Sequence, residues 1–189
     1  MMWSRHWVST WIVTSWPPET EEILRYQWKA AVPVWKALAA RARDHGVKRI
    51  ALEFHGWQLV YNVETLRRLR SEVGDDILGV NLDPSHLFWM GADPVEVARA
   101  LADCIYHVHI KDISRTLENG RIYCPIGQGL LPVESTVRWL EGQGYQGFYS
   151  LEWEKSALEG QGVGFEEQLE SFVSFMRGVE QDGNSQITL

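Results

Sequence analysis

The stretch GVNLDPSHLFWMGADP, residues 79–94, contains two signals that together decide the fold. With the two residues before it, its first part gives a mostly apolar run at 77–82 that predicts a buried strand. Its last part predicts a helix start, because Asp93 can cap the helix, Pro94 suits the first helical position and Glu96 suits a capping box. A strand followed closely by a helix is the unit from which parallel α/β folds are built.

The same alternation extends along most of the chain. Strands are predicted at 10–15, 47–54, 77–82, 105–111 and 147–153. Helices are predicted at about 17–44, 62–73, 93–103, 133–141 and 164–179, with a loop at 112–131. Pro33 is expected to kink or split the first helix. This pattern indicates parallel βαβ units in one domain over residues 1–189, with a polar tail at 181–189.

The composition is that of an ordinary soluble protein and excludes several functions. The chain has 189 residues, of which 45% are hydrophobic and 23% charged, with a net charge of -7. This charge argues against a nucleic-acid partner, because binding the phosphate backbone needs a basic surface. No run reaches the ~20 apolar residues of a membrane span, so no membrane partner is expected. Cys104 and Cys124 form no C-x-x-C pair and no visible disulfide framework, so a reducing, cytoplasmic location is expected.

Polar residues inside the predicted strands point to a shared site. Parallel strands are buried on both faces, so a polar side chain within them needs a reason. Four strands carry such a group near the carboxyl end, where barrels and open α/β sheets place their sites: Glu53, Asp83, His109 and Glu152. Three carboxylates and one imidazole suit one divalent ion, with Mn²⁺ or Mg²⁺ favoured and Co²⁺, Zn²⁺ or Fe²⁺ as alternatives. The alternative is that each group separately caps a strand or lies on the surface.

Four segments in combination resemble the sugar phosphate isomerase/epimerase family of the xylose-isomerase-like TIM-barrel superfamily. They are residues 79–94, HVHIKD at 107–112, PIGQG at 125–129 and SLEWE at 150–154. The resemblance covers about residues 10–180. It implies an α/β fold, a partial (β/α)₈ TIM barrel made of roughly the last five βα units. A full barrel takes about 250 residues, so the first three units are expected to be absent from this chain.

The resemblance also implies which residues act. The metal ligands would be Glu53, Asp83, His109 and Glu152. Glu53 and Glu152 would also be catalytic, exchanging a proton with a carbon next to a carbonyl. Substrate would be bound by His86, Lys111, His55 and Trp57, with Lys111 or His86 stabilising oxyanion charge.

Structural roles for these substrate-binding residues stay open. His86 could cap or pack after Pro84, and Lys111 could form an ion pair with a nearby acid. His55 and Trp57 could cap the loop that follows their strand.

The expected activity is that of a metal-dependent isomerase or epimerase acting on a small sugar or polyol. An inosose-type dehydratase of the same family is the next alternative, and a non-catalytic, metal-binding truncated barrel is another. Apurinic-site nucleases share the superfamily, but they need a multi-zinc site and a basic DNA face. The missing half leaves three outcomes: a poorly stable truncated product, a homo-oligomer or second chain that completes the barrel, or an open half-barrel without turnover.

Overall fold

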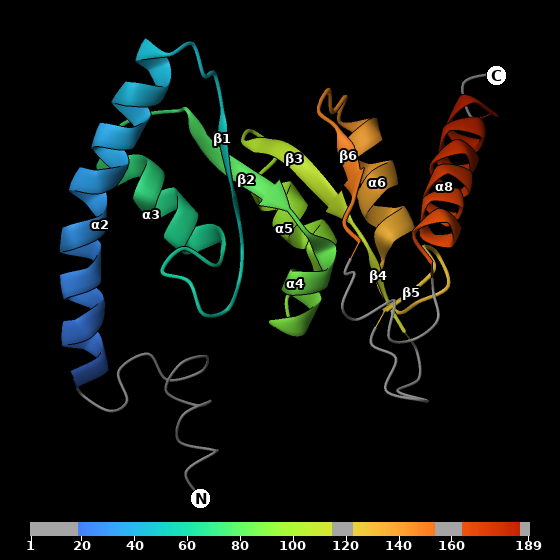
Figure 1. Cartoon of the computed structure of the whole chain (residues 1–189), viewed down its shortest axis with the longest axis horizontal. Coiled ribbons are helices and arrows are strands. Elements are labelled where there is room, and N and C mark those ends of the chain that lie inside the picture. Colours follow the sequence, from blue (N-terminus) through green and yellow to red (C-terminus); the bar gives the residue numbers. More distant parts are fainter. Residues whose placement is uncertain (1–18, 115–122, 154–163, 186–189) are drawn as a thin grey trace, which may run out of the picture. The chain divides into compact units, whose positions relative to one another are not determined.

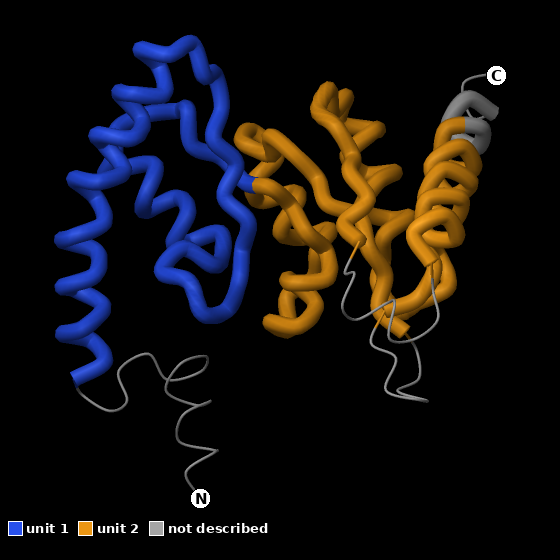
Figure 2. The backbone as a smooth tube through the Cα atoms, in the orientation of Figure 1, with its two compact units in different colours: residues 1–80 blue, residues 81–189 orange. Residues whose placement is uncertain are grey.

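The computed structural model describes residues 19–114, 123–153 and 164–185 (Figure 1). The strand predicted at 10–15 lies outside these residues. The chain divides into two compact units, residues 1–80 and 81–189, and the division falls within strand β2 (Leu78–Leu82) (Figure 2).

Unit 1 contains α2 (Glu19–Asp44), β1 (Ile50–Glu53), α3 (Val63–Val73) and the start of β2. Strand β1 lies next to β2, and the Ile50 N–H donates to the Ile77 carbonyl at 2.7 Å. Helix α2 packs against α3. It runs unbroken through Pro33, so the helix is not split there. Pro33 is exposed, where water can solvate the carbonyl that loses its helical partner.

Helix α3 has the predicted ends. The Thr65 N–H donates to Asn62 Oδ1 at 2.9 Å, and the Asn62 N–H donates back to Thr65 Oγ1 at 3.1 Å, which forms a capping box. Gly74 ends the helix with φ of 72°, a left-handed conformation that glycine adopts without strain. Leu66 and Leu69 of α3 are fully buried.

Unit 2 holds the end of β2 and the remaining elements. These are α4 (Pro84–Trp89), α5 (Pro94–Ala100), β3 (Ile105–Ile110), β4 (Asp112–Ile113), β5 (Tyr123–Cys124), α6 (Val133–Gly142), β6 (Tyr149–Leu151) and α8 (Phe165–Ser185). Its strands lie in the order β2-β3-β6, and β3 runs parallel to β6 with Val108 opposite Tyr149. Helix α6 packs against both α5 and α8 (Figure 1). The result is an α/β fold with a parallel sheet, part of a TIM-barrel-like architecture.

Three details of unit 2 differ from the sequence prediction. The loop expected at 112–131 contains the antiparallel pair β4 and β5. A short helix, α4, follows β2 directly, because Asp83 caps it and Pro84 takes its first position. Helix α8 continues to Ser185, into the residues expected to form a polar tail.

Among the described residues, no helix combines the length and the apolar content that a membrane span requires.

Candidate functional site

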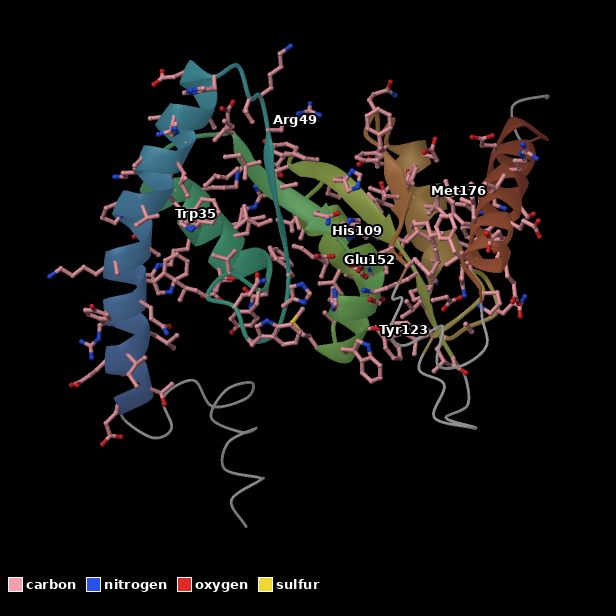
Figure 3. The ribbon with its side chains drawn as sticks, viewed as in Figure 1. Trp35, Arg49, His109, Tyr123, Glu152 and Met176 are labelled. Atoms are coloured by element: carbon pink, nitrogen blue, oxygen red, sulfur yellow. The ribbon has the colours of Figure 1, made fainter. Side chains whose placement is uncertain are left out.

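Unit 2 brings five of the predicted site residues together. Three of them directly follow strands β2, β3 and β6: Asp83, Lys111 and Glu152. The other two are His86 in α4 and His109 in β3. Figure 3 shows His109 and Glu152 lying side by side, with His109 Nδ1 3.5 Å from Glu152 Oε2. Parallel strands end at the same edge of a sheet, which is why residues far apart in sequence meet here.

Lys111 lies at the centre of this cluster. Its Nζ is 2.5 Å from Glu152 Oε2 and 3.1 Å from Asp83 Oδ2. The same atom is 3.3 Å from His86 Nε2, and the ring centroid of Tyr123 lies 5.7 Å away. The Lys111 side chain is only 3% exposed, so its ammonium group interacts with the two carboxylates with little screening by water. The ion pair considered from the sequence is therefore present, and it is made within the candidate site.

Asp83 is buried, and its two oxygens have different surroundings. Oδ1 accepts the Ser85 N–H at 2.7 Å. Oδ2 faces Lys111 and lies 3.6 Å from His86 Nε2, but no described residue gives it a hydrogen bond of regular geometry. Burial raises the pKa of Asp83 to about 6, although the nearby ammonium of Lys111 opposes the shift. Above this pKa the carboxylate is ionised, and Oδ2, whose described partner is the Lys111 ammonium, can also accept a metal cation.

Glu152 has the opposite electrostatic behaviour. Burial alone would raise its pKa, but hydrogen bonds with His109, Asp83 and Lys111 hold the pKa well below its ordinary value. The Glu152 carboxylate also raises the pKa of Asp83, because it accepts a hydrogen bond from the protonated form of Asp83. The two carboxyl groups titrate as a pair, in which Glu152 stays ionised while Asp83 takes up the proton.

Two further residues belong to this cluster and were not predicted as site residues. The Asn81 side-chain amide nitrogen lies 3.1 Å from His109 Nδ1 and orients the imidazole. Its signal in the sequence was its place on the same strand face as Asp83. Tyr123 comes from β5 in the predicted loop, and no local pattern links it to Lys111.

Unit 1 contains the other three predicted site residues. His55 Nε2 lies 3.4 Å from Glu53 Oε2, and the His55 ring stacks on Trp57 with centroids 4.8 Å apart. Trp57 is 78% exposed. Their participation in a site with the residues of unit 2 stays a prediction.

The donor groups of unit 2 fit a divalent cation. Asp83, His86 and Glu152 each offer one ligand atom, and these atoms lie within 4.8 Å of one another. Asp83 Oδ2 is buried and has no regular hydrogen bond from the described residues. A bound cation would supply the polar partner that such a buried oxygen needs. Carboxylate and imidazole donors together accept Mn²⁺, Mg²⁺, Zn²⁺ and related ions.

Curated relatives of the chain include a protein without a named activity and two dehydratases. YfiH of Bacillus subtilis (strain 168) is 55% identical over 109 residues, which are 56% of this chain and 34% of YfiH. A 3-dehydroshikimate dehydratase of Bacillus anthracis is 32% identical over 116 residues, 55% of this chain and 41% of that enzyme. An inosose dehydratase of Clostridium perfringens (strain 13 / Type A) is 24% identical over 144 residues, 68% of this chain and 48% of that enzyme. The chain thus spans between a third and a half of these relatives.

Solved structures and a family model agree on the fold. The IOLI protein with a bound zinc atom superposes with a TM-score of 0.63 at 25% identity, over 80% of this chain and 55% of that one. L-ribulose 3-epimerase gives a TM-score of 0.64 at 16% identity over 86% of this chain and 58% of that one, a likeness of fold. The model of the family described as "Xylose isomerase-like TIM barrel" matches residues 6–176. The chain belongs to the xylose isomerase-like TIM barrel family.

Proposed function

We propose that the cluster around Lys111 belongs to a metal-dependent isomerase or epimerase that moves a proton next to the carbonyl of a small sugar or polyol. The observation that carries the proposal is the geometry of Asp83 and Glu152, whose carboxylate oxygens lie 3.1 Å and 2.5 Å from the buried ammonium group of Lys111. The opposite directions of their pKa shifts support it. Divergent pKa values in neighbouring carboxyl groups are typical of acid–base sites.

The side chains would have separate roles in this reaction. Glu152 remains ionised near neutral pH and would remove the proton from carbon. The Lys111 ammonium would stabilise the negative charge that develops on the neighbouring oxygen, with His86 beside it. Glu53 would return a proton from the other face of the substrate, and Trp57 with His55 would contact the sugar ring.

A divalent metal held by Asp83, His109, Glu152 and Glu53 would polarise the carbonyl and a neighbouring hydroxyl when bound. His86 is the imidazole that lies with Asp83 and Glu152 among the potential ligand atoms, so it is an alternative to His109 as a ligand. The oxygen-rich donor set favours Mn²⁺ or Mg²⁺, whereas the IOLI structure contains zinc. Binding titrations with Mn²⁺, Mg²⁺ and Zn²⁺ on the metal-free protein would rank these ions.

Proton transfer can be tested without knowledge of the true substrate. The protein is incubated with Mn²⁺ in D₂O and a panel of ketoses and inososes, and proton NMR follows deuterium incorporation beside the carbonyl. Exchange is expected with the unaltered chain, and Glu152→Gln should abolish it. Glu134→Gln is the matched control, because Glu134 is an exposed acid that pairs with Arg138 on the same helix, α6, and it should leave exchange unchanged. Light scattering on the same samples reports whether activity accompanies the homo-oligomer considered from the sequence.

The absence of exchange across the panel, in a protein that still binds Mn²⁺, would contradict the proposal. The non-catalytic metal-binding alternative would then explain the site better.

Dehydration is a second candidate, favoured by the names of two relatives. It begins with the same proton removal, after which a hydroxyl group on the next carbon takes up a proton from an acidic group of the site and leaves as water. The two outcomes differ in product: an epimerase interconverts isomers of equal mass, whereas a dehydratase forms a product that is lighter by one water. Mass spectrometry of the reaction mixture separates them.

A further inference from the structure

Asp112 is a buried carboxylate that the proposed chemistry does not use. Its side chain is 1% exposed, and each of its oxygens accepts two backbone N–H groups. Oδ1 accepts from Ile113 at 2.8 Å and from Leu131 at 3.2 Å, while Oδ2 accepts from Gly127 at 3.0 Å and from Gly129 at 2.9 Å. Burial raises the pKa of Asp112, and the four N–H groups oppose that shift. The carboxylate therefore fastens the P-I-G-Q-G segment to β4.

The segment is built closely around this carboxylate. A Cβ atom on Gly129 would lie 2.1 Å from Asp112 Oδ1 and 2.3 Å from the Ile113 carbonyl oxygen, which only glycine avoids. Gly127 has a φ of 83°, in the left-handed region. The Leu130 N–H donates to the Ile113 carbonyl at 2.8 Å. The contact with Asp112 and the conformation of the turn are thus sufficient to explain the two glycines of the motif.

Asp112 is also the immediate neighbour of Lys111. Successive side chains of extended backbone point to opposite sides. The Asp112 side chain contacts residues 127–131, whereas the Lys111 side chain contacts Asp83 and Glu152. On β5, Tyr123 pairs with Ile113, and its ring lies over the Lys111 ammonium. Fixing Asp112 therefore fixes the backbone from which Lys111 extends.

We propose that Asp112 is a positioning residue, which holds Lys111 between Asp83 and Glu152 by locking the 127–131 backbone onto β4. A lysine side chain has four rotatable bonds, so its ammonium is placed accurately only if its backbone is held and its end is paired. The geometry of this proposal stands on the contacts above. Only the chemical role of Lys111 rests on the proposed function.

The test measures how well Lys111 is protected, and it needs no substrate. Native protein is pulsed with acetic anhydride, and mass spectrometry follows acetylation of Lys111. In Asp112→Asn the amide NH₂ cannot accept a hydrogen bond, so two buried N–H groups lose their acceptor. We expect Lys111 acetylation to rise about tenfold, because an unsatisfied buried group makes local opening more frequent. Gly129→Ala, which displaces the segment but keeps the carboxylate, should have the same effect.

The matched control is Leu66→Ala, which lowers stability by emptying part of the core of unit 1 without touching the site. Lys111 acetylation should stay near the unaltered rate in this control. If Asp112→Asn speeds amide exchange at 127–131 while Lys111 acetylation is unchanged, Asp112 only closes the loop and the proposal is wrong. The proposal would also be wrong if Leu66→Ala raised Lys111 acetylation as much as Asp112→Asn does.

If Asp112→Asn and Gly129→Ala both fail to fold, measurements on the unaltered protein decide the question. Amide exchange of Gly129 and acetylation of Lys111 are then measured over a range of low urea concentrations. Equal urea dependence means that they are exposed by one opening event, as proposed, and different dependence overturns the proposal.

Activity measurements would separate this inference from the proposed function. Where turnover is detected, Asp112→Asn should lower kcat more than it changes KM, and it should have little further effect in a Lys111→Met background. If no substrate is turned over but Lys111 acetylation changes as expected, the positioning role stands and the proposed function falls.

Discussion

Asp83 and Asp112 are two buried carboxylates that meet their hydrogen-bonding needs in different ways. Asp112 receives four backbone N–H groups, so both of its oxygens are occupied by the chain itself. Asp83 receives one, from Ser85, and turns its second oxygen toward Lys111 and His86. Burial raises the pKa of both. The comparison teaches that a buried acid serves structure where the backbone saturates it, and remains available for chemistry where it does not.

Removal of Asp83 should weaken metal binding far more than removal of Asp112, and this is the largest expected effect. Asp83→Ala removes a proposed ligand, and we expect Mn²⁺ affinity to fall by more than the 10–100-fold typical of residues that only orient ligands. Asp112→Asn should change the affinity by no more than about tenfold. Calorimetric titration of Mn²⁺ measures both. Equal losses in the two variants would show that the distinction between the carboxylates is wrong.

The free energy of unfolding should instead depend more on Asp112 than on Asp83. Asp112→Asn leaves two buried N–H groups without an acceptor, which costs about 2–4 kcal/mol of unfolding free energy. Asp83→Asn relieves the burial of a charge and should change the unfolding free energy by less than about 1 kcal/mol near neutral pH. Urea unfolding followed by tryptophan fluorescence measures these values. Asp76→Asn is the control for removing a surface charge, because the Asp76 side chain is 86% exposed and its ion pair is with the half-exposed Arg43.

The pH dependence should separate Asp83 from its neighbours. Its pKa is about 6 in the folded chain against 3.8 when unperturbed, so the folded state binds the proton more tightly. The stability that Asp83 contributes is therefore full below about pH 4 and is lost as pH rises through 6. Glu152 has a lowered pKa, so its contribution is present above its ordinary pKa of 4.5 and is lost at lower pH.

Urea unfolding at pH 5 and pH 7.5 tests this sign. Relative to Asp83→Asn, the unaltered chain should lose stability between the two values, while its Mn²⁺ affinity should rise because Asp83 becomes ionised. A stability difference that grows in favour of the unaltered chain at pH 7.5 would contradict the raised pKa.

The smallest effect is expected within the segment that Asp112 holds. Gln128 is exposed and is not among the four residues whose N–H groups bind the carboxylate, so Gln128→Ala should change the unfolding free energy by no more than about 0.5 kcal/mol. Gly129→Ala, one residue further, should be far more damaging because of the close approach of Asp112. Thermal unfolding of the two variants makes the comparison, and similar midpoints would show that the segment is looser than its hydrogen bonds indicate.

Local patterns were sufficient to predict the main elements and the proximity of two candidate site residues. Apolar runs predicted β2 and β3, and the caps at Asn62 and Asp93 were read correctly from side-chain chemistry. The alternation of strand faces predicted that His109 and Glu152 would meet. These features depend on residues a few positions apart, or on the shared direction of parallel strands.

Features that depend on distant pairing could not be predicted. Strands β4 and β5 are two residues each, and they exist only because they pair with one another. Helix α4 is six residues long, and D-P-S is equally compatible with a turn. The hydrogen bonds of Asp112 reach 15–19 residues along the chain, so the H-x-K-D and P-x-G-x-G motifs were visible separately while their connection was not.

Alternate residues of the loop donate to Asp112, and this spacing fixes the length of the loop. Its N–H groups come from residues 127, 129 and 131, while the side chains of 128 and 130 are exposed. One residue inserted or deleted here would turn every donor after it away from the carboxylate. The segment can therefore vary in composition at positions 128 and 130 but not in length, and any transfer of it to another barrel would require Asp112 as well.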